Sequence, residues 1–215
     1  MRKITLIGLS LLCVLTILAG ASSAHATTPS QKQSISQSEV KFHNEFRRLW
    51  FDHVLWTSNY ITSATTAGAE DQKQVLARLL KNQEDIGNAI KPVYGEDAGN
   101  KLTVLLKEHI VIAGKIVDAA KAGKGDMVKQ LDKEWHRNAD DIAEFLSGAN
   151  PNLKIEDLKK LLYMHLELVT NDLSASLVKD WDARITAIDD GVTHIIIMSD
   201  AISSGIVKQF PQKFK

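Results

Sequence analysis

Histidine and asparagine recur at a fixed spacing in this chain, and imidazole can bind a metal or exchange a proton near neutral pH. The stretch LLKEHIVIAGKI, residues 105–116, places one histidine in a run of Leu, Ile and Val that should be buried. Six residues fall into two columns with an interval of 56 residues: His53, His109 and His165, and Asn82, Asn138 and His194. The spacing indicates a repeated polar position rather than one isolated buried histidine.

The residues around these columns agree in type. HVLWTSNYI, HIVIAGKIV and HLELVTNDL each begin with the histidine, and each has a small residue at the sixth place. NQEDIGNAI matches NADDIAEFL, which pairs Asp85 with Asp141. The segment HIIIMSDAI, which begins at His194, does not match these two segments. The spacing of its residues instead resembles that of the segments that begin with the histidines of the first column. We interpret the pattern as an internal repeat of 56 residues that contains two helices per copy.

Helical spacing runs from Ser36 to the end of the chain, and no segment alternates as a strand does. Ser36-x-x-Glu39 is typical of a capping box. Breaks are expected at residues 67–68, 91–95, 123–125, 150–151 and 179–180. They leave six helices of roughly 20 to 28 residues with short turns. The predicted fold is all-α, an up-and-down bundle of three αα-hairpins.

The two columns lie near the middle of their helices, so antiparallel packing would bring all six residues to one level. Their apolar neighbours at helical spacing predict that this layer faces the core. A buried polar group without a partner costs roughly 1–3 kcal/mol. The layer must therefore be satisfied by its own members, by water or by a ligand.

Two interpretations of the layer remain open. Buried His and Asn can pair with each other and fix the register of the helices. Alternatively, His53, His109, His165 and His194 can converge on Zn²⁺ or Cu²⁺. Asn82 and Asn138 would then belong to the ligand site, with Asp85 and Asp141 as acceptors for imidazole N–H groups. These two carboxylates can equally be exposed helix charges.

No signature of a known catalytic site is present. The chain lacks HExxH, a Gly-rich phosphate loop, a G-x-S-x-G elbow and C-x-x-C-H, and no Glu stands three residues before any of the four histidines. An enzymatic role would need an acid or base in a cleft, for which Asp85, Asp141 and Glu108 are the candidates. We assign no catalytic residue.

Other residues are expected at the surface. His136 stands one place before the Asn column and should look sideways or outward, and His43 should be solvated. Trp181 falls in a turn and is the aromatic residue expected to be exposed. Trp135 and Trp50 have helical spacing and are expected in the core.

The beginning of the chain is typical of a secretory signal peptide. Arg2 and Lys3 precede an apolar run, and Ala24-His25-Ala26 fits the cleavage rule, which predicts a signal peptide over residues 1–26. Residues 27–37 are predicted to be a disordered leader, and residues 38–215 a single helical domain. The one cysteine, Cys13, lies in the signal peptide. We therefore expect a secreted or extracytoplasmic protein without disulfides, lipid anchor or transmembrane anchor.

The charge balance gives no reason to expect nucleic acid as a partner. Without Arg2 and Lys3 the 26 basic side chains become 24, against 26 acidic ones, so the mature chain has a net charge near −2.

Four segments carry a resemblance to a family: HVLWTSNYI, LLKNQEDIGNAIKPVYGEDAGNKL, NADDIAEFLSGANPN and GIVKQFPQKF. The chain resembles, along essentially its whole mature length, a functionally uncharacterised family of small exported helical proteins of spore-forming Gram-positive bacteria. The resemblance implies export and a helical fold, and it supplies no catalytic residues. Some members carry a glycosyltransferase label, but this chain has no nucleotide-sugar α/β domain.

Two functions follow from these observations. The first is an exported, non-catalytic bundle that binds a small ligand, in particular a metal ion, through the buried His/Asn layer. The second is a structural or cell-envelope interaction protein in which the layer only fixes helix register and binding maps to exposed side chains such as Trp181.

Overall fold

The computed structural model describes residues 35–215, so the expected signal peptide and most of the expected leader lie outside the described residues. This part of the chain contains six α-helices, one short 3₁₀ helix and no strand. The elements are α1 (Gln37–Thr65), α2 (Gln72–Tyr94), α3 (Glu96–Lys121), α4 (Gly125–Ala149), α5 (Ile155–Val178), α6 (Trp181–Gln209) and η1 (Pro211–Phe214). The prediction of an all-α chain of six helices is confirmed.

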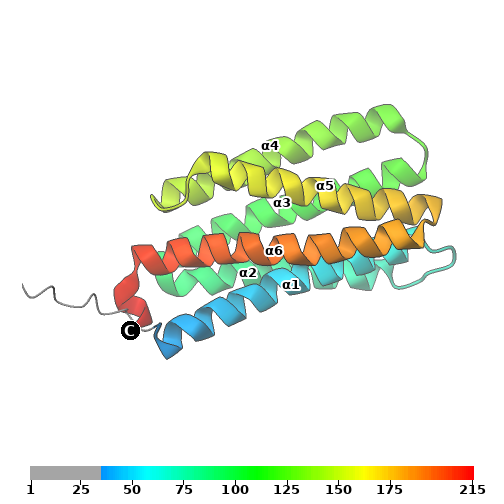
Figure 1. Cartoon of the computed structure of the whole chain (residues 1–215). Helices are drawn as coiled ribbons and strands as arrows, with labels where there is room; N and C mark the ends of the chain where they lie inside the picture. Colours follow the sequence, from blue (N-terminus) through cyan, green and yellow to red (C-terminus); the bar gives the residue numbers. More distant parts are fainter. Residues whose placement is uncertain (1–34) are drawn as a thin grey trace, which may run out of the picture. The chain divides into compact units, whose positions relative to one another are not determined.

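Short turns connect the helices, and each helix runs antiparallel to the one before it (Figure 1). At the start of α1 the Ser36 hydroxyl accepts a hydrogen bond from the Glu39 N–H at 3.0 Å, so the predicted N-cap is confirmed. Gly68 and Gly123 adopt positive φ in two of the turns. Lys179 adopts the same left-handed conformation, with φ 60°, between α5 and α6.

The break predicted at residues 91–95 is shorter in the structure. Helix α2 continues through Pro92 to Tyr94, and Gly95 at φ 90° separates it from α3. A proline in the last turn removes only one backbone N–H, and its fixed φ is compatible with a helix. The glycine, rather than the proline, ends the helix.

The last helix does not continue to the end of the chain. Helix α6 ends at Gln209, and η1 turns back toward the start of α1. Phe214 is buried there, with its ring centroid 4.9 Å from that of Phe42. The Ser36 hydroxyl donates to the Phe214 carbonyl, so the two ends of the helical domain are joined.

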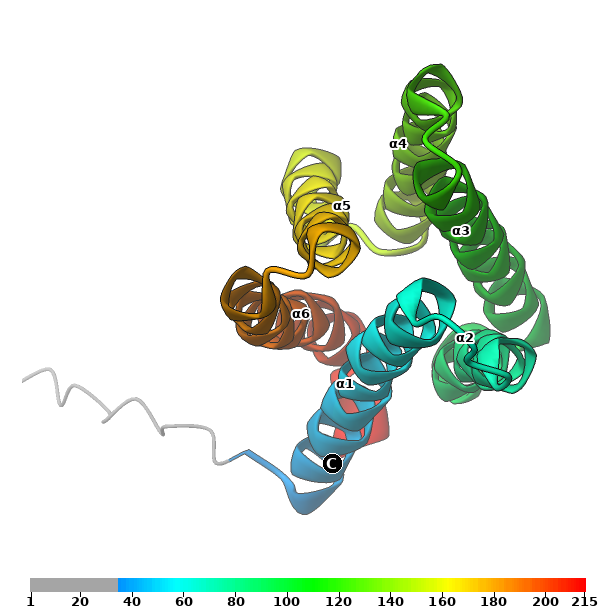
Figure 2. The same cartoon turned by 90° about the vertical axis from the view of Figure 1, so that its right-hand side faces the viewer.

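Successive helices are neighbours around the bundle, and α6 returns beside α1 (Figure 2). Helix α1 is the most central, because it contacts α2, α3, α5 and α6. One apolar core of Leu, Ile, Val, Phe and Trp side chains runs through the bundle. The bundle is thus an up-and-down arrangement of three hairpins, α1–α2, α3–α4 and α5–α6.

Candidate functional site

The polar layer predicted from the sequence lies at the middle of the bundle. It consists of His53, Asn82, His109, Asn138, His165 and His194, one residue near the midpoint of each helix. The first five are at most 3 % exposed, and His194 is partly buried. Antiparallel packing of helices of similar length brings these midpoints to one level.

The second helix of each hairpin bonds to the first through this layer. Asn82 Nδ2 donates to the Leu49 carbonyl at 2.9 Å, and Asn138 Nδ2 donates to the Leu105 carbonyl at 3.2 Å. His194 Nε2 donates to the Leu161 carbonyl at 2.8 Å. Each acceptor lies one helical turn before the histidine of its own helix. The three contacts therefore share one sequence separation and hold each hairpin in the same register.

Amide side chains also contact two of the imidazoles. His109 Nδ1 lies 2.8 Å from Asn138 Oδ1, and the amide nitrogen of Asn138 is committed to Leu105, so Nδ1 carries the proton and donates. Gln83 Nε2, which donates to the Leu79 carbonyl at 2.9 Å, also lies 3.2 Å from His53 Nδ1 and from Asn82 Oδ1. The third hairpin has no such contact, and His165 Nδ1 has no hydrogen-bond partner.

Three of the four predicted metal ligands lie together. His53 Nε2 and His165 Nε2 are 3.3 Å apart, and the ring centroids of His109 and His165 are 6.1 Å apart. We call His53, His109 and His165 the histidine trio. His194 instead directs its Nε2 to the backbone of α5. Within residues 35–215, no group of three or more His, Cys, Asp or Glu side chains has the arrangement needed to hold a metal ion.

Burial keeps the trio neutral. It lowers the pKa of His53 to about 3, an effect that the nearby His109 increases. Burial likewise lowers the pKa of His109 to about 4, against the hydrogen bond to Asn138. The pKa of His165 is held well below its usual range by burial and by the neighbouring imidazoles. Near neutral pH all three are uncharged.

The two aspartates proposed as acceptors for the imidazoles have cationic partners instead. Asp85 lies 2.8 Å from Lys81 Nζ, and Asp141 lies 2.5 Å from Arg137. Both carboxylates are partly exposed. Of the two roles considered for them, the exposed helix charge is the one that matches this arrangement. Glu108, the third acidic candidate, also pairs with Arg137, at 2.7 Å.

A buried ion pair near the layer was missed by sequence reasoning. Asp172 Oδ1 accepts from Arg184 Nε at 3.0 Å and from Ser176 Oγ at 3.2 Å, and Asp172 is 5 % exposed. Burial raises the pKa of Asp172, and the Arg184 charge opposes that shift. Arg184 also donates to Ser58 and Thr62 of α1, at 3.0 and 2.6 Å. The partners are twelve residues apart on different helices, a spacing that carries no sequence signal.

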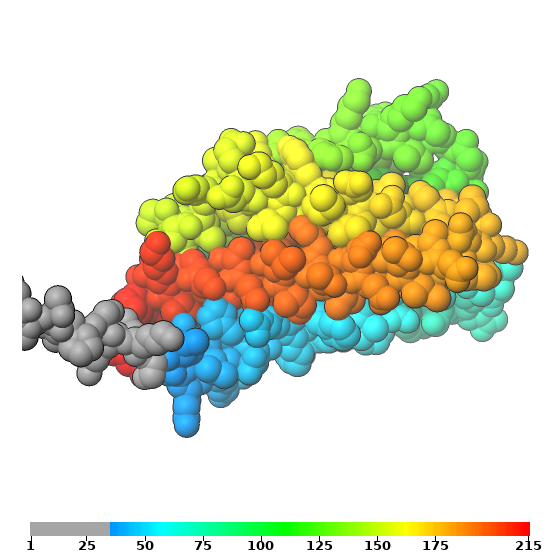
Figure 3. Space-filling view, in the orientation of Figure 1, coloured from blue at the N-terminus to red at the C-terminus, as the bar shows by residue number. Residues whose placement is uncertain are grey.

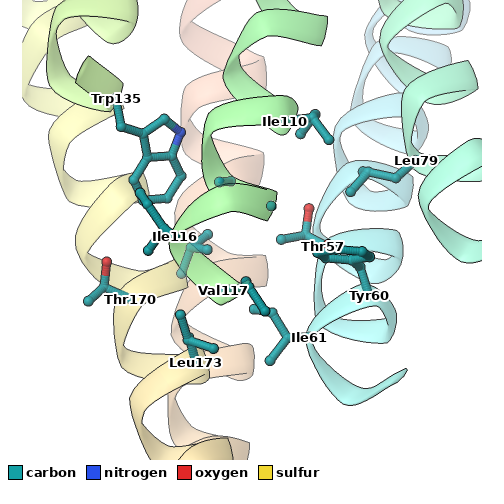
Figure 4. A pocket seen from close by; sticks show the side chains of 13 residues that line it. Thr57, Tyr60, Ile61, Leu79, Ile110, Ile116, Val117, Trp135, Thr170 and Leu173 are labelled. Carbon is teal, nitrogen blue, oxygen red and sulfur yellow. The ribbon is translucent and has the colours of Figure 1, made fainter. Parts of the chain in front are cut away.

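An apolar cavity of about 30 Å³ lies next to the layer, between α1, α3, α4 and α5 (Figure 4). Its walls include Ile61, Val117, Trp135 and Leu173. Of the hydroxyl groups that line it, Thr57 donates to His53 O, Thr170 donates to Leu166 O, and Tyr60 accepts from Gln72. The cavity therefore offers mainly methyl and aromatic surface, and it is far smaller than the roughly 150 Å³ that holds a benzene ring.

The outer surface has two further features. A groove of about 560 Å³ runs between α4 and α5, beside His136 and Tyr163, where Figure 3 shows the surface hollowed between the green and yellow helices. At the α5–α6 turn, four apolar side chains are 37 to 75 % exposed: Leu177, Val178, Trp181 and Ile185. We call these four the Trp181 patch. The predicted exposure of Trp181 is confirmed, although this residue opens α6 rather than lying in the turn.

The two lesser histidines have defined surroundings. His136 is partly exposed and faces Tyr163, with 5.0 Å between ring centroids, which agrees with the sideways position expected for it. His43 was expected to be solvated, but its Nδ1 lies 2.7 Å from the Ser203 hydroxyl on α6. It therefore links the first and last helices.

Comparison of the chain with protein-family models, with curated proteins and with solved structures gives no match. None of the helices in residues 35–215 combines the length and hydropathy of a membrane span.

Proposed function

We propose that the chain is an exported, non-catalytic interaction protein of the cell envelope, and that its buried His/Asn layer fixes the register of the helices. The observation that carries this proposal is the set of three equivalent hydrogen bonds from Asn82, Asn138 and His194 to the preceding helices. They use the polar groups of the layer for contacts within the protein. Export is proposed from the basic start, apolar run and cleavage site in residues 1–26.

The Trp181 patch is the surface that we assign to the partner. Exposed apolar side chains scattered singly are normal, whereas neighbouring ones often mark interaction sites. Trp181 and Ile185 are one turn apart on α6, and Val178 ends α5 just before the turn. Tryptophan is enriched among the residues that dominate binding energy.

Binding to isolated Gram-positive cell envelopes tests this assignment. Trp181→Ser should weaken binding at least tenfold, because it removes the largest apolar contact. The matched control is Ile197→Ser, which changes an apolar side chain of α6 that is 55 % exposed but lies outside the patch. Equal binding by both variants would mean that the Trp181 patch is not the surface that binds the partner.

A metal-binding function is the second candidate, and one distance favours it. Two imidazole nitrogens bound tetrahedrally to one Zn²⁺ at about 2.0–2.1 Å stand about 3.3 Å apart. His53 Nε2 and His165 Nε2 have this separation. No carboxylate joins them in the described residues, so a divalent ion would bring uncompensated charge into the core, which is costly.

Elemental analysis of untagged, exported protein separates the two candidates. The register proposal expects less than about 0.1 equivalent of zinc or copper per chain. Near-stoichiometric metal that is lost in His165→Ala and in His109→Ala would instead establish the metal site. In that case the ligand would be a transition metal, as the sequence suggested.

A further inference from the structure

The third hairpin differs from the other two at one position of the layer. The first two hairpins have Asn82 and Asn138, whereas the third has His194. In the second hairpin the asparagine serves both the backbone of α3 and the imidazole of His109. His194 uses its Nε2 for the backbone of α5, and His165 Nδ1 is left as a buried polar atom without a protein partner.

The hydrogen bonds around His165 determine which of its nitrogens carries the proton. Gln83 Nε2 has two hydrogens and three acceptors within reach, Leu79 O at 2.9 Å and both Asn82 Oδ1 and His53 Nδ1 at 3.2 Å. We take the arrangement in which it donates to His53 Nδ1, so that in the neutral ring His53 Nε2 carries the hydrogen. His53 Nε2 then donates to His165 Nε2 at 3.3 Å. In this arrangement His165 has its proton on Nδ1. A buried N–H without an acceptor costs roughly 1–3 kcal/mol, so an acceptor is required at this position.

His165 lines a cavity of about 20 Å³ between α1, α5 and α6. This volume is enough for one water molecule, which needs at least about 10–15 Å³. The same cavity is lined by Asp172, Thr57 and Ser58. The Asp172 carboxylate accepts from Ser176 and Arg184 on Oδ1, and Ser58 is a further partner, so Oδ2 retains a lone pair that can accept from a water molecule. Thr57 donates to a backbone carbonyl, so its oxygen can also accept.

We infer that this cavity binds a single internal water molecule that accepts from His165 Nδ1–H and donates to Asp172 and Thr57. Three partners of this kind are typical of buried water. A cation is disfavoured, because Arg184 already neutralises Asp172 and His165 presents a proton to the cavity. The volume excludes an organic ligand.

The water would connect two groups of polar residues that the protein alone leaves separate. The hydrogen-bonded chain would run from Gln83 through His53 and His165 to the water, and from there to the Asp172–Arg184 pair at the edge of the bundle. The trio would thereby be linked to the partly exposed Arg184. This inference goes beyond the proposed function and holds whichever partner the Trp181 patch contacts.

A crystal structure at high resolution tests the site directly, together with a ¹H–¹⁵N spectrum of the histidine rings in solution. We expect one water within hydrogen-bond distance of His165 Nδ1 and of Asp172, and a His165 ring that is protonated on Nδ1. A cavity without density, or a ring protonated on Nε2, would overturn the inference.

Two glycine variants provide a matched test of stability. Gly191 lines the cavity, and a Cβ built on it has no neighbour nearer than Val54 Cγ1 at 3.9 Å, so Gly191→Ala should displace the water without a clash. Gly148, in α4, is exposed with open space around its Cβ position. Gly148→Ala should raise the folded-to-unfolded ratio about fivefold through helix propensity.

Gly191→Ala should fail to raise that ratio, because His165 Nδ1–H loses its acceptor. An equal or larger increase in Gly191→Ala would mean that the cavity is dry and that a methyl group fills it favourably. Neither result depends on binding to envelopes or on metal content, so failure of this inference and failure of the proposed function can be told apart.

Discussion

At the scale of single residues, the main feature is a set of three histidine side chains that are uncharged in the folded protein. The pKa of His53 is lowered to about 3 and that of His109 to about 4, and the pKa of His165 is lowered as well. In the unfolded chain a histidine has a pKa of about 6.5. Between these values the unfolded state binds more protons than the folded state, so acid favours unfolding.

The free energy of unfolding should therefore fall as the pH is lowered below about 6.5. The contribution of the trio is fully present above that pH and is lost progressively toward the folded pKa values. His53 and His109 each account for roughly 2 kcal/mol at pH 5 relative to pH 8, or roughly 4 kcal/mol together, and His165 changes the stability in the same direction. Urea unfolding at pH 8, 6 and 5 measures this loss.

Two variants identify the residues responsible for the pH dependence. His165→Gln should reduce the slope of stability against pH between 7 and 5 by about one third, because one of three groups no longer titrates. His136→Gln, at a partly exposed ring, should leave the slope unchanged. A slope that is the same in both variants would mean that the trio is not the source.

The contact between His109 and Asn138 gives a second residue-scale prediction. Asn138→Ala removes the bond to Leu105 and leaves His109 Nδ1–H without an acceptor, so it should cost about 2–4 kcal/mol. Asn88→Ala, at an exposed position of α2, should change stability by less than about 0.5 kcal/mol. A double-mutant cycle with His109→Ala should give a coupling energy of about 0.5–3 kcal/mol, and a value near zero would argue against the contact.

The sequence could identify the layer but not all of its partners. The interval between His53, His109 and His165 and their apolar neighbours was enough to predict burial. Gln83 was not predicted to reach His53, because the Asn beside it matched the column better. The orphaned His165 Nδ1 could not be foreseen either, since it depends on which nitrogen of His194 faces α5.

At the scale of helices and turns, Lys179 is the residue whose backbone conformation is least favourable for its type. It ends α5 in the left-handed region, where the Cβ of an L-residue is crowded. Two other turns of the bundle have glycine in this region, Gly68 and Gly123. Replacing Lys179 should therefore relieve strain.

Lys179→Gly is expected to stabilise the domain by about 0.5–1 kcal/mol, which corresponds to a rise in Tm of about 1–4 °C. Thermal unfolding followed by circular dichroism measures the shift. Lys115→Gly, at an exposed position inside α3, should instead destabilise by about 1 kcal/mol. If both glycine variants lower Tm, the backbone of Lys179 is not strained in solution.

Helix number and type could be predicted because the apolar period is strong along the whole domain. Helix ends were less certain where two signals compete, as at Pro92 and Gly95. Pro92 removes only its own backbone N–H, the Gly95 N–H after it still bonds to the Lys91 carbonyl, and the positive φ of Gly95 ends the helix. The N-cap at Ser36 was predicted correctly, because its hydroxyl accepts from the Glu39 N–H, which is one of the two bonds of a capping box.

At the scale of the whole domain, the order of the helices around the bundle was not predictable. It depends on contacts between the first and last helices, such as His43 with Ser203 at 2.7 Å and Arg47 with Asp200. These pairs are far apart in sequence and leave no periodic pattern. The three hairpins, by contrast, follow from short turns between long helices.

We propose that the helical domain is held in register by its own polar layer, without a bound metal. Equilibrium unfolding of the purified protein, with and without EDTA and with one equivalent of Zn²⁺ added back, tests it most directly. We predict that the midpoint of unfolding is the same under all three conditions. A midpoint that falls with EDTA and recovers with Zn²⁺ would contradict the claim and would place a stabilising metal in the fold.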